Sequence, residues 1–187
     1  MESKWLMAND ETEPISIFLS DTEFEGVTFW NEVAVALDLH GRKFIDCTFE
    51  RCQLSSVKIQ GAVIQAKFIE SKIEGINFFT AKRPLLSLSF FRCLIRHSSF
   101  AELKMQNVSF AGCTLKNVDF SDADLSSADF TNTTFDNCVF RNTNLTKADF
   151  RYAIGYYIDP TLNKVKGARF SSPDVLGLLA GFDIVIE

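Results

Sequence analysis

Between Phe90 and Phe150, large hydrophobic residues recur at every fifth position. The series runs through Phe90, Ile95, Phe100, Met105, Phe110, Leu115, Phe120, Leu125, Phe130, Phe135, Phe140, Leu145 and Phe150. Helices and ordinary strands repeat their apolar residues with periods of 3.6 and 2, so a period of five indicates an internal repeat instead. We call these large residues the repeat centres.

The residue two places before each centre is mostly small or β-branched, as at Val118, Ala123 and Ala128. Residues two apart in an extended chain point to the same side. Each repeat is therefore expected to send one large and one small side chain inward. The residue between them faces outward, and Asp is frequent at that position, as at Asp124 and Asp129.

The residue two places after each centre favours turns. The eight examples in order are Asn107, Gly112, Asn117, Asp122, Ser127, Asn132, Asn137 and Asn142. Such residues tolerate a left-handed backbone or form local hydrogen bonds. We therefore expect the chain to turn a corner every five residues and to close into a coil.

The number of sides of this coil follows from the centres, because every second one is Phe. A ten-residue alternation requires an even number of sides, and two sides leave no room for the rings. Four sides, with twenty residues per coil, are predicted. Phe90, Phe110, Phe130 and Phe150 would then stack on one side, and Phe100, Phe120 and Phe140 on the opposite side. Neighbouring coils would lie ~4.8 Å apart, a spacing at which rings can stack in an offset manner.

The triplets Ala123-Asp124-Leu125, Ala128-Asp129-Phe130 and Ala148-Asp149-Phe150 resemble the A(D/N)LXX signature of the pentapeptide-repeat family. This resemblance implies an all-β fold, a right-handed quadrilateral parallel β-helix. A solenoid of this kind needs a cover over its last coil.

The pattern divides the chain into three parts. Residues 1–20 are expected to be a flexible tail, with a strand near 15–18 as a possible N-terminal cap. Residues 21–150 are the repeat, with interruptions near 30–43 and 79–87 and one residue dropped at a corner between Ile64 and Phe68. Residues 151–187 are the C-terminal cap, with a short helix over 174–180 that begins after a Ser-Pro-Asp start signal and a strand over 182–186.

The apolar residues of this last part also predict a self-complementary contact between two copies of the chain, although a cap alone remains the alternative. The dimer candidates are Leu176, Leu179, Phe182, Ile184 and Ile186.

Charge is distributed unevenly along the chain. Residues 1–23 hold six acids and one base, which accounts for the net charge of −5. Residues 42–104 hold eleven bases and five acids, whereas residues 106–150 hold six acids and three bases. The rod is thus basic in its front half and acidic in its back half. Lys82 and Arg83, in the second interruption, either contact a partner or form a solvated bend.

No residue pattern predicts catalysis, a metal or a cofactor. The five Cys all stand at the small inward position and are expected to be buried, and their odd number without a secretion signal argues against a disulfide framework. Neither His40 nor His97 completes a metal-ligand pattern with them. No apolar run is long enough to span a membrane. We therefore expect a cytoplasmic binding protein that is not an enzyme.

A narrower resemblance covers the C-terminal segment from Tyr157 to Ile184 and the interruption from Gly75 to Pro84. Both are similar to the albicidin-resistance members of the family and, more loosely, to the microcin-immunity and quinolone-resistance (Qnr) members. This resemblance implies a homodimeric rod that mimics B-form DNA, binds DNA gyrase or topoisomerase IV, and protects it from a poison. The partner-binding candidates are Asp119, Asp122, Asp124, Asp129, Asp136 and Asp149, which would stand in for phosphates, together with Lys82 and Arg83.

Two alternatives remain open. One is a protein-interaction scaffold with no role at topoisomerases. The other is a nucleic-acid binder, whose contact residues would be Arg51, Lys58, Lys67, Lys72, Lys82 and Arg83. We rank direct nucleic-acid binding last, because the aromatic residues between these bases point inward and are not free to stack on nucleobases.

Overall fold

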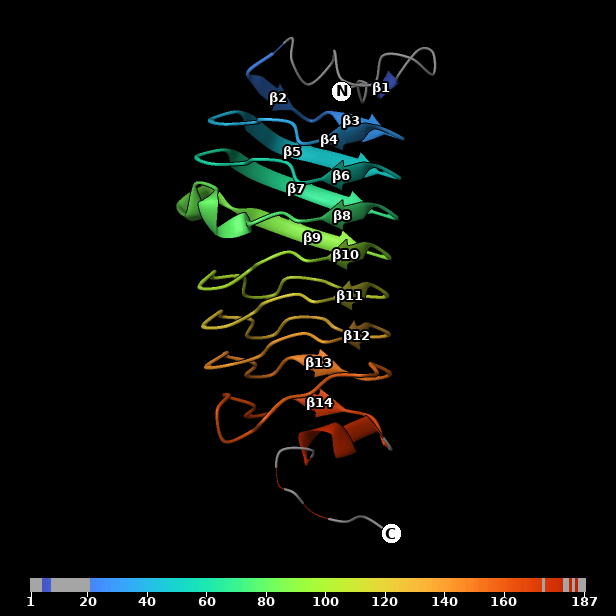
Figure 1. Cartoon of the computed structure of the whole chain (residues 1–187), viewed down its shortest axis with the longest axis vertical. Coiled ribbons are helices and arrows are strands. Elements are labelled where there is room, and N and C mark those ends of the chain that lie inside the picture. The colour runs from blue at the N-terminus through green and yellow to red at the C-terminus, as the bar shows by residue number, and fades with distance from the viewer. Residues whose placement is uncertain (1–4, 8–20, 173, 180–181, 183, 185–187) are drawn as a thin grey trace.

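The computed structural model describes residues 5–7, 21–172, 174–179, 182 and 184. It is a parallel β-solenoid of about seven turns, drawn out into a rod with residues 21–30 near one end and residues 169–179 near the other (Figure 1). The all-β, four-sided coil predicted from the repeat is confirmed.

Short strands line the coils. They are β1 (Trp5–Met7), β2 (Glu23–Glu25), β3 (Thr28–Trp30), β4 (Val33–Val35), β5 (Lys43–Glu50), β6 (Gln53–Ser55), β7 (Val63–Ile69), β8 (Lys72–Glu74), β9 (Ser87–Phe91), β10 (Leu94–Arg96), β11 (Thr114–Lys116), β12 (Thr134–Asp136), β13 (Asp149–Phe150) and β14 (Arg169–Phe170). One sheet has the order β1-β3-β5-β7-β9, with β2 also on β5. A second has the order β12-β11-β10-β8-β6-β4, and β13 pairs with β14.

The register gives the length of one coil. Ile95 lies beside Leu115, and Leu115 lies beside Phe135, always as parallel partners. Each step is twenty residues, or four repeat centres. Residues twenty apart in sequence are therefore neighbours along the rod, and this rule decides which surface side chains meet.

The corners have the backbone that the sequence predicted. All eight turn residues from Asn107 to Asn142 have a positive φ, between 51° and 67°. Arg92, Lys147 and Tyr152 occupy the same place in their repeats and share this conformation. A left-handed residue other than Gly costs about 1–2 kcal/mol. The closure of the coil therefore imposes the conformation even where the side chain does not favour it.

Two ladders of Phe rings fill the interior. The longer one contains Phe29, Phe49, Phe68, Phe90, Phe110, Phe130, Phe150 and Phe170, with successive ring centroids 4.8–5.2 Å apart. The shorter one contains Phe78, Phe100, Phe120 and Phe140, at 4.6–5.5 Å. The ladders meet edge to face, as Phe90 and Phe100 do at 5.6 Å. The predicted stacking on two opposite sides is confirmed.

The interruption expected at 30–43 is absent. Strand β4 pairs with β6 at the usual offset of twenty, and Asp38 lies beside Lys58. Ala34 and Leu39 are the repeat centres of this coil, and both are buried. The pattern was missed because Ala34 is small for a centre and because Glu32, a charged residue, occupies the small inward position with no exposed surface.

Two coils differ in length. The register between β5 and β7 shifts after Phe44, so that Phe49 lies beside Phe68, one residue fewer than a regular coil. Phe68 in turn lies beside Phe90, so the next coil has two residues more than a regular coil. The segment that accommodates the two extra residues contains two 3-10 helices, η1 (Phe78–Thr80) and η2 (Arg83–Leu85), and protrudes from the side of the rod (Figure 1).

The solenoid continues for one coil beyond Phe150, where we had placed the start of the cap. Phe150 lies beside Phe170, and Thr134 beside Ile154. Gly155 takes the centre position in this coil, and a Cβ there would lie 2.2 Å from the carbonyl oxygen of Phe135. Glycine is therefore required at that point.

The segment after this coil differs from the predicted helix and strand. The short helix expected over 174–180 is a 3-10 helix, η3 (Asp174–Leu178), and Leu178 packs against the core together with Phe170. Phe182 lies in a helical turn and Ile184 has no regular structure, so these two residues are not in a strand. The remaining residues of the expected strand, and the expected N-terminal strand at 15–18, lie outside the described residues. At the N-terminal end, β1 pairs in parallel with β3.

The Phe ladder predicts a large cost for truncating one ring. Phe120 is fully buried, and its ring stacks between those of Phe100 and Phe140. Phe120→Ala should lower the free energy of unfolding by roughly 3–5 kcal/mol in urea titrations, because it leaves a cavity between two coils. Val139→Ala is the control, because the side chain of Val139 is 47% exposed, and it should change the free energy of unfolding by less than about 0.5 kcal/mol. Equal effects of the two substitutions would contradict the ladder model.

Candidate partner-binding surface

The six candidate Asp residues are spread around the rod. We number the four faces by the centres Phe110 (face 1), Leu115 (face 2), Phe120 (face 3) and Leu125 (face 4). Asp129 and Asp149 lie on face 1, Asp136 on face 2, Asp119 on face 3, Asp122 at the corner between faces 3 and 4, and Asp124 on face 4. Only Asp129 and Asp149 are direct neighbours in the register. The acidic residues therefore surround the back half of the rod and do not form one row.

Several of these carboxylates also stabilise the corners. Oδ1 of Asp119 accepts a hydrogen bond from the Ser121 N–H at 2.9 Å, and Oδ1 of Asp129 accepts one from the Thr131 N–H at 2.9 Å. The same contact joins Asp124 to the Ser126 N–H and Asp149 to the Arg151 N–H, each at 3.1 Å. One oxygen of each carboxylate is thus engaged by the chain's own turn.

The environment of two of these groups favours the charged form. At Asp124, burial opposes ionisation, but hydrogen bonds from Ser126, Gln106 and Asn144 outweigh it and lower the pKa. At Asp149, the side-chain hydrogen bonds from Arg151 are the main cause of a lowered pKa. Both groups therefore remain ionised at neutral pH.

Two of the six acids are neutralised by a neighbouring base. Nζ of Lys116 lies 3.0 Å from Asp136, and the guanidinium of Arg151 lies 2.6 Å from Asp149. Asp119, Asp122, Asp124 and Asp129 form no ion pair with any residue in the described part of the chain. These four carry the negative charge of this region, and we call them the acidic set.

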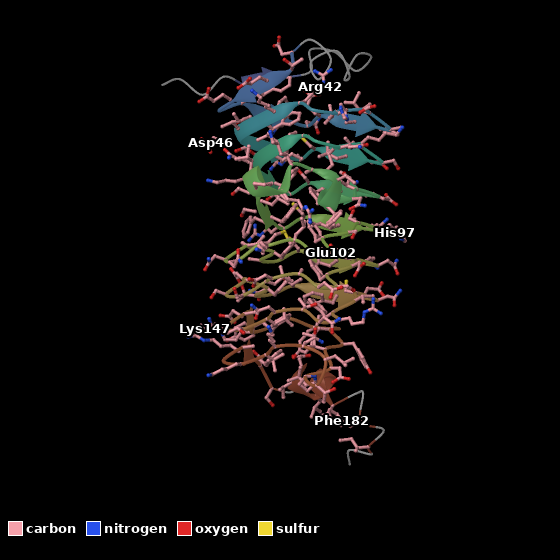
Figure 2. The ribbon with its side chains drawn as sticks, turned by 90° about the vertical axis from the view of Figure 1, so that its left-hand side faces the viewer. Arg42, Asp46, His97, Glu102, Lys147 and Phe182 are labelled. Carbon is pink, nitrogen blue, oxygen red and sulfur yellow. The ribbon has the colours of Figure 1, made fainter. Side chains whose placement is uncertain are left out.

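The basic candidates Lys82 and Arg83 are exposed on the protruding turns. The guanidinium of Arg83 lies 4.2 Å from the centroid of the Phe79 ring. Beside it is a hollow of about 450 Å³, whose lining also includes Glu102 and Lys104 of the following coil. Figure 2 labels Glu102 on the side of the rod.

Sequence reasoning did not place Glu102 and Lys104 beside Arg83, since they are about twenty residues away from it in the chain.

A second hollow lined by charges of both signs was not predicted either. It lies on face 1, measures about 780 Å³, and is lined by Asp129, Lys147, Asp149, Arg151 and Arg169, among others. The signal that reveals both is the twenty-residue spacing, which places residues of successive coils side by side.

The described dimer candidates are exposed at the C-terminal end of the rod. Leu176 is 44%, Leu179 37%, Phe182 47% and Ile184 54% exposed, and Ile186 lies outside the described residues. Phe182 is labelled beyond the last coil in Figure 2. The last coil adds four exposed apolar side chains that are not among the dimer candidates. These are Tyr152, Ile154, Tyr157 and Leu162.

Two further findings concern chemistry and membranes. Among the residues that the structure describes, no group of three or more His, Cys, Asp or Glu side chains is placed to hold a metal ion. None of the helices in the described ranges has the length and apolar character needed to cross a bilayer.

Comparison with known proteins agrees with the fold. Residues 81–150 match the family model described as a pentapeptide repeat region. A search of curated protein sequences found no match.

Solved structures match over most of the chain. Two trypsin-treated forms of QnrB1, described as a plasmid-mediated fluoroquinolone resistance protein, are 14% and 13% identical, with TM-scores of 0.67 and 0.63. Each alignment covers 89% of this chain, together with 94% and 95% of the respective QnrB1 chain. HetL, a pentapeptide repeat protein involved in heterocyst differentiation regulation from the cyanobacterium Nostoc sp., is 11% identical, covers 81% of this chain and 88% of that one, and has a TM-score of 0.37. At these identities the likeness concerns the fold.

The double role of Asp124 predicts how stability depends on pH. Since its pKa is lower in the folded protein, its contribution is complete above the unfolded value of about 4 and is lost as the pH falls through the folded value. Asp124→Asn should therefore show a shallower fall of Tm below pH ~4. Asp124→Ala should also lose about 1 kcal/mol at neutral pH, because the Ser126 N–H loses its acceptor. Identical Tm profiles for wild type and Asp124→Asn would contradict this assignment.

Proposed function

We propose that this pentapeptide-repeat protein is a cytoplasmic, dimeric binding protein that occupies the DNA-binding surface of DNA gyrase or topoisomerase IV and protects the enzyme from a poison. The observation that carries the proposal is the ring of carboxylates around the back half of a rigid rod. Its fold is shared over most of its length with QnrB1, a fluoroquinolone resistance protein.

The density of carboxylates supports DNA mimicry. Residues 106–150 make about two and a quarter coils, or ~11 Å of rod at ~4.8 Å per coil. B-DNA carries one negative charge per ~1.7 Å, or about six over the same length. This segment holds six acids, so its gross density of negative charge is similar to that of DNA. The three bases of this segment reduce its net negative charge to half of the gross value. The acidic set is therefore the part that can attract a basic surface.

Dimerisation would extend this surface. Eight of the twelve exposed large apolar side chains among the described residues lie at the C-terminal end, from Tyr152 to Ile184, next to the acidic coils. Two copies joined at this end would place both acidic segments in the middle of one long rod and the basic segments at its two ends. The bases of the front half would then lie away from the centre of the contact.

A second candidate function is a protein-interaction scaffold without a role at topoisomerases. The observation in its favour is the mixture of charges on the faces. Lys116 neutralises Asp136, Arg151 neutralises Asp149, and Lys104 lies directly beside Asp124 in the register. A surface of this kind also suits a partner that presents both signs of charge.

A supercoiling assay with purified DNA gyrase tests the main proposal. The full-length protein, titrated into reactions poisoned with ciprofloxacin or albicidin, should restore supercoiling. Inhibition of gyrase without rescue would indicate binding but would contradict protection from these drugs. No effect on either gyrase or topoisomerase IV would favour the scaffold, and direct binding to DNA with a steep salt dependence would favour the nucleic-acid binder.

Charge variants test which residues carry the effect. Replacing the four Asp residues of the acidic set by Asn keeps an acceptor at the corners but removes four charges. It should raise the protein concentration needed for rescue by about fourfold or more, since exposed charge contacts contribute ~0.2–1 kcal/mol each. The matched control neutralises four front-half acids, Asp38, Asp46, Glu50 and Glu74, and should retain rescue. An equal loss of supercoiling rescue in both variants would indicate a general effect of net charge and would contradict a contact at the acidic set.

The dimer can be tested separately by light scattering coupled to gel filtration. The wild type should have twice the mass of one chain, and the double variant Tyr157→Asp, Leu176→Asp should be monomeric, because both side chains are more than 40% exposed in the single chain. Circular dichroism should show that the variant keeps its β-structure. A wild-type protein with the mass of one chain at micromolar concentration would overturn this part of the proposal.

A further inference from the structure

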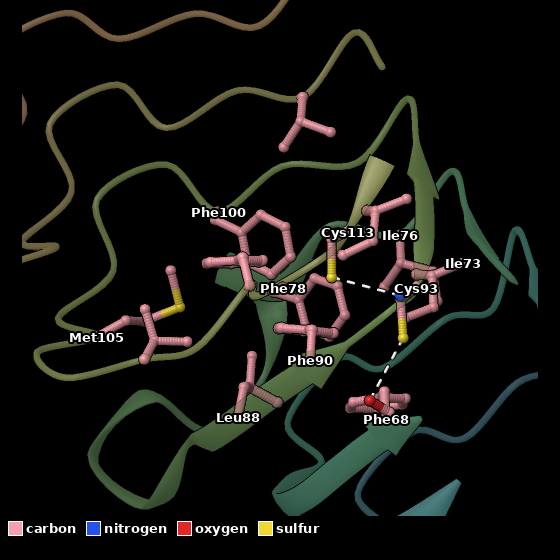
Figure 3. Close-up of a cluster of buried hydrophobic side chains, with 14 of the residues drawn as sticks. Phe68, Ile73, Ile76, Phe78, Leu88, Phe90, Cys93, Phe100, Met105 and Cys113 are labelled. Carbon is pink, nitrogen blue, oxygen red and sulfur yellow. Dashed lines mark hydrogen bonds between the residues drawn. The ribbon is translucent and has the colours of Figure 1, made fainter. Parts of the chain in front are cut away.

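Two of the buried thiols lie next to each other in adjacent coils. Cys93 and Cys113 stand two places before Ile95 and Leu115, which are direct partners in the register. The exposed fractions of the two Cys are 2% and 1%. The Cys93 N–H donates a hydrogen bond to Sγ of Cys113 at 3.3 Å (Figure 3).

This pair belongs to a column of polar side chains inside one corner of the rod. Ser71, one coil before Cys93, accepts a hydrogen bond from the Cys52 N–H at 3.0 Å and donates one to the Phe49 carbonyl at 3.0 Å. Thr133, one coil after Cys113, donates to the Phe110 carbonyl at 2.7 Å. Ser71 thus separates Cys52 from Cys93, whereas no residue of the column stands between Cys93 and Cys113. Within the described coils, Cys93 and Cys113 are the two thiols that follow one another directly in this column.

We propose that Cys93 and Cys113 form an oxidation site that closes a disulfide between adjacent coils. Parallel strands lie ~4.8 Å apart, and disulfides form between Cα atoms ~4.4–6.8 Å apart, so the coils need not separate. In the reduced protein, Sγ of Cys93 donates to the Phe68 carbonyl at 3.3 Å. The Cys93 thiol must turn away from Phe68 to reach Cys113. The hydrogen bond from the Cys93 N–H to Sγ of Cys113 is lost in this movement.

The two thiols differ in acidity. The side-chain interaction with Cys113 is the main cause of a lowered pKa at Cys93, and the same interaction together with burial raises the pKa of Cys113. Because the thiolate is the nucleophile, Cys93 is the residue that reacts first.

The oxidant must be small enough to enter when the corner opens locally, and hydrogen peroxide or a small alkyl hydroperoxide meets this condition. The Cys93 thiolate attacks one peroxide oxygen, which breaks the O–O bond, gives a sulfenic acid and releases water or an alcohol. Sγ of Cys113 then attacks the sulfenic sulfur and displaces its oxygen as water. In total, the two thiols lose two protons and two electrons, and the peroxide gains them.

The position of the bond gives it a structural effect. Cys93 follows β9, the strand that leaves the protruding turns with Lys82 and Arg83. A disulfide to Cys113 would fix this coil to the next one and close a loop of about twenty residues, which constrains the unfolded chain.

Peptide mass spectrometry under non-reducing conditions tests the proposal. The reduced full-length protein is treated with hydrogen peroxide, quenched with iodoacetamide and digested. A linked Cys93–Cys113 peptide, lighter by two hydrogens, should appear in the monomer, together with a Tm several degrees higher that dithiothreitol reverses. If Cys138, the most exposed of the five thiols, is oxidised while Cys93 and Cys113 are alkylated as free thiols after unfolding, the proposal is wrong.

Variants assign the linked residues. Cys113→Ser should abolish the linked peptide and the rise in Tm, and Ser71 shows that a hydroxyl fits this column. Cys138→Ser is the matched control and should keep both effects. If Cys113→Ser does not fold, the wild-type peptide map alone still decides the proposal. A linked peptide that joins two different chains would overturn it as well.

Discussion

Stacking of Phe rings along the rod is the interaction on which the rest of the structure depends. Eight rings follow one another on one side at 4.8–5.2 Å, close to the ~4.8 Å between hydrogen-bonded strands, so one repeat distance satisfies both the rings and the backbone. Burial of one such side chain contributes about 1.5–3 kcal/mol. This exceeds the cost of about 1–2 kcal/mol for a left-handed corner. Arg92, Lys147 and Tyr152 therefore adopt a backbone that their side chains do not favour.

Most of the fold could be predicted because the large centres mark the coil directly. The prediction failed where the interior is filled in another way. Ala34 is a centre without a large side chain, and Glu32 is a carboxylate in a position where small residues are usual. In the last coil Gly155 leaves the centre empty, and the neighbouring Tyr156 turns its ring inward, 5.5 Å from that of Phe150. A template of residue types does not detect these substitutions, because they depend on what the adjacent coils leave unfilled.

The surface was harder to predict than the core, although the same coil length governs both. Along the sequence the acidic residues follow one another every five residues or so, which resembles a single row. In the coil, five residues are a quarter of a turn, and the neighbours on the surface are twenty residues apart. Lys116 thus meets Asp136, and Lys104 meets Asp124, although neither pair is close in sequence. The face of each residue follows from the four-sided coil, but the ion pairs depend on rotamers that the sequence does not specify.

The outward Asp of the repeat has a structural role that is independent of any partner. Asp38 and Asp159, outside the acidic segment, accept the same N–H two residues on, at 2.9 Å and 2.8 Å. Asn144 and Ser109 do so without any charge. The corner itself is therefore sufficient to account for an Asp at this position. Asp122 is different, because it lies at the exposed corner, forms no ion pair within the described ranges, and accepts a hydrogen bond from the side-chain amide of Asn142. The turn needs only a positive φ there, which Asn or Gly supplies equally well. The charge of Asp122 is thus the part of the acidic set that folding does not require.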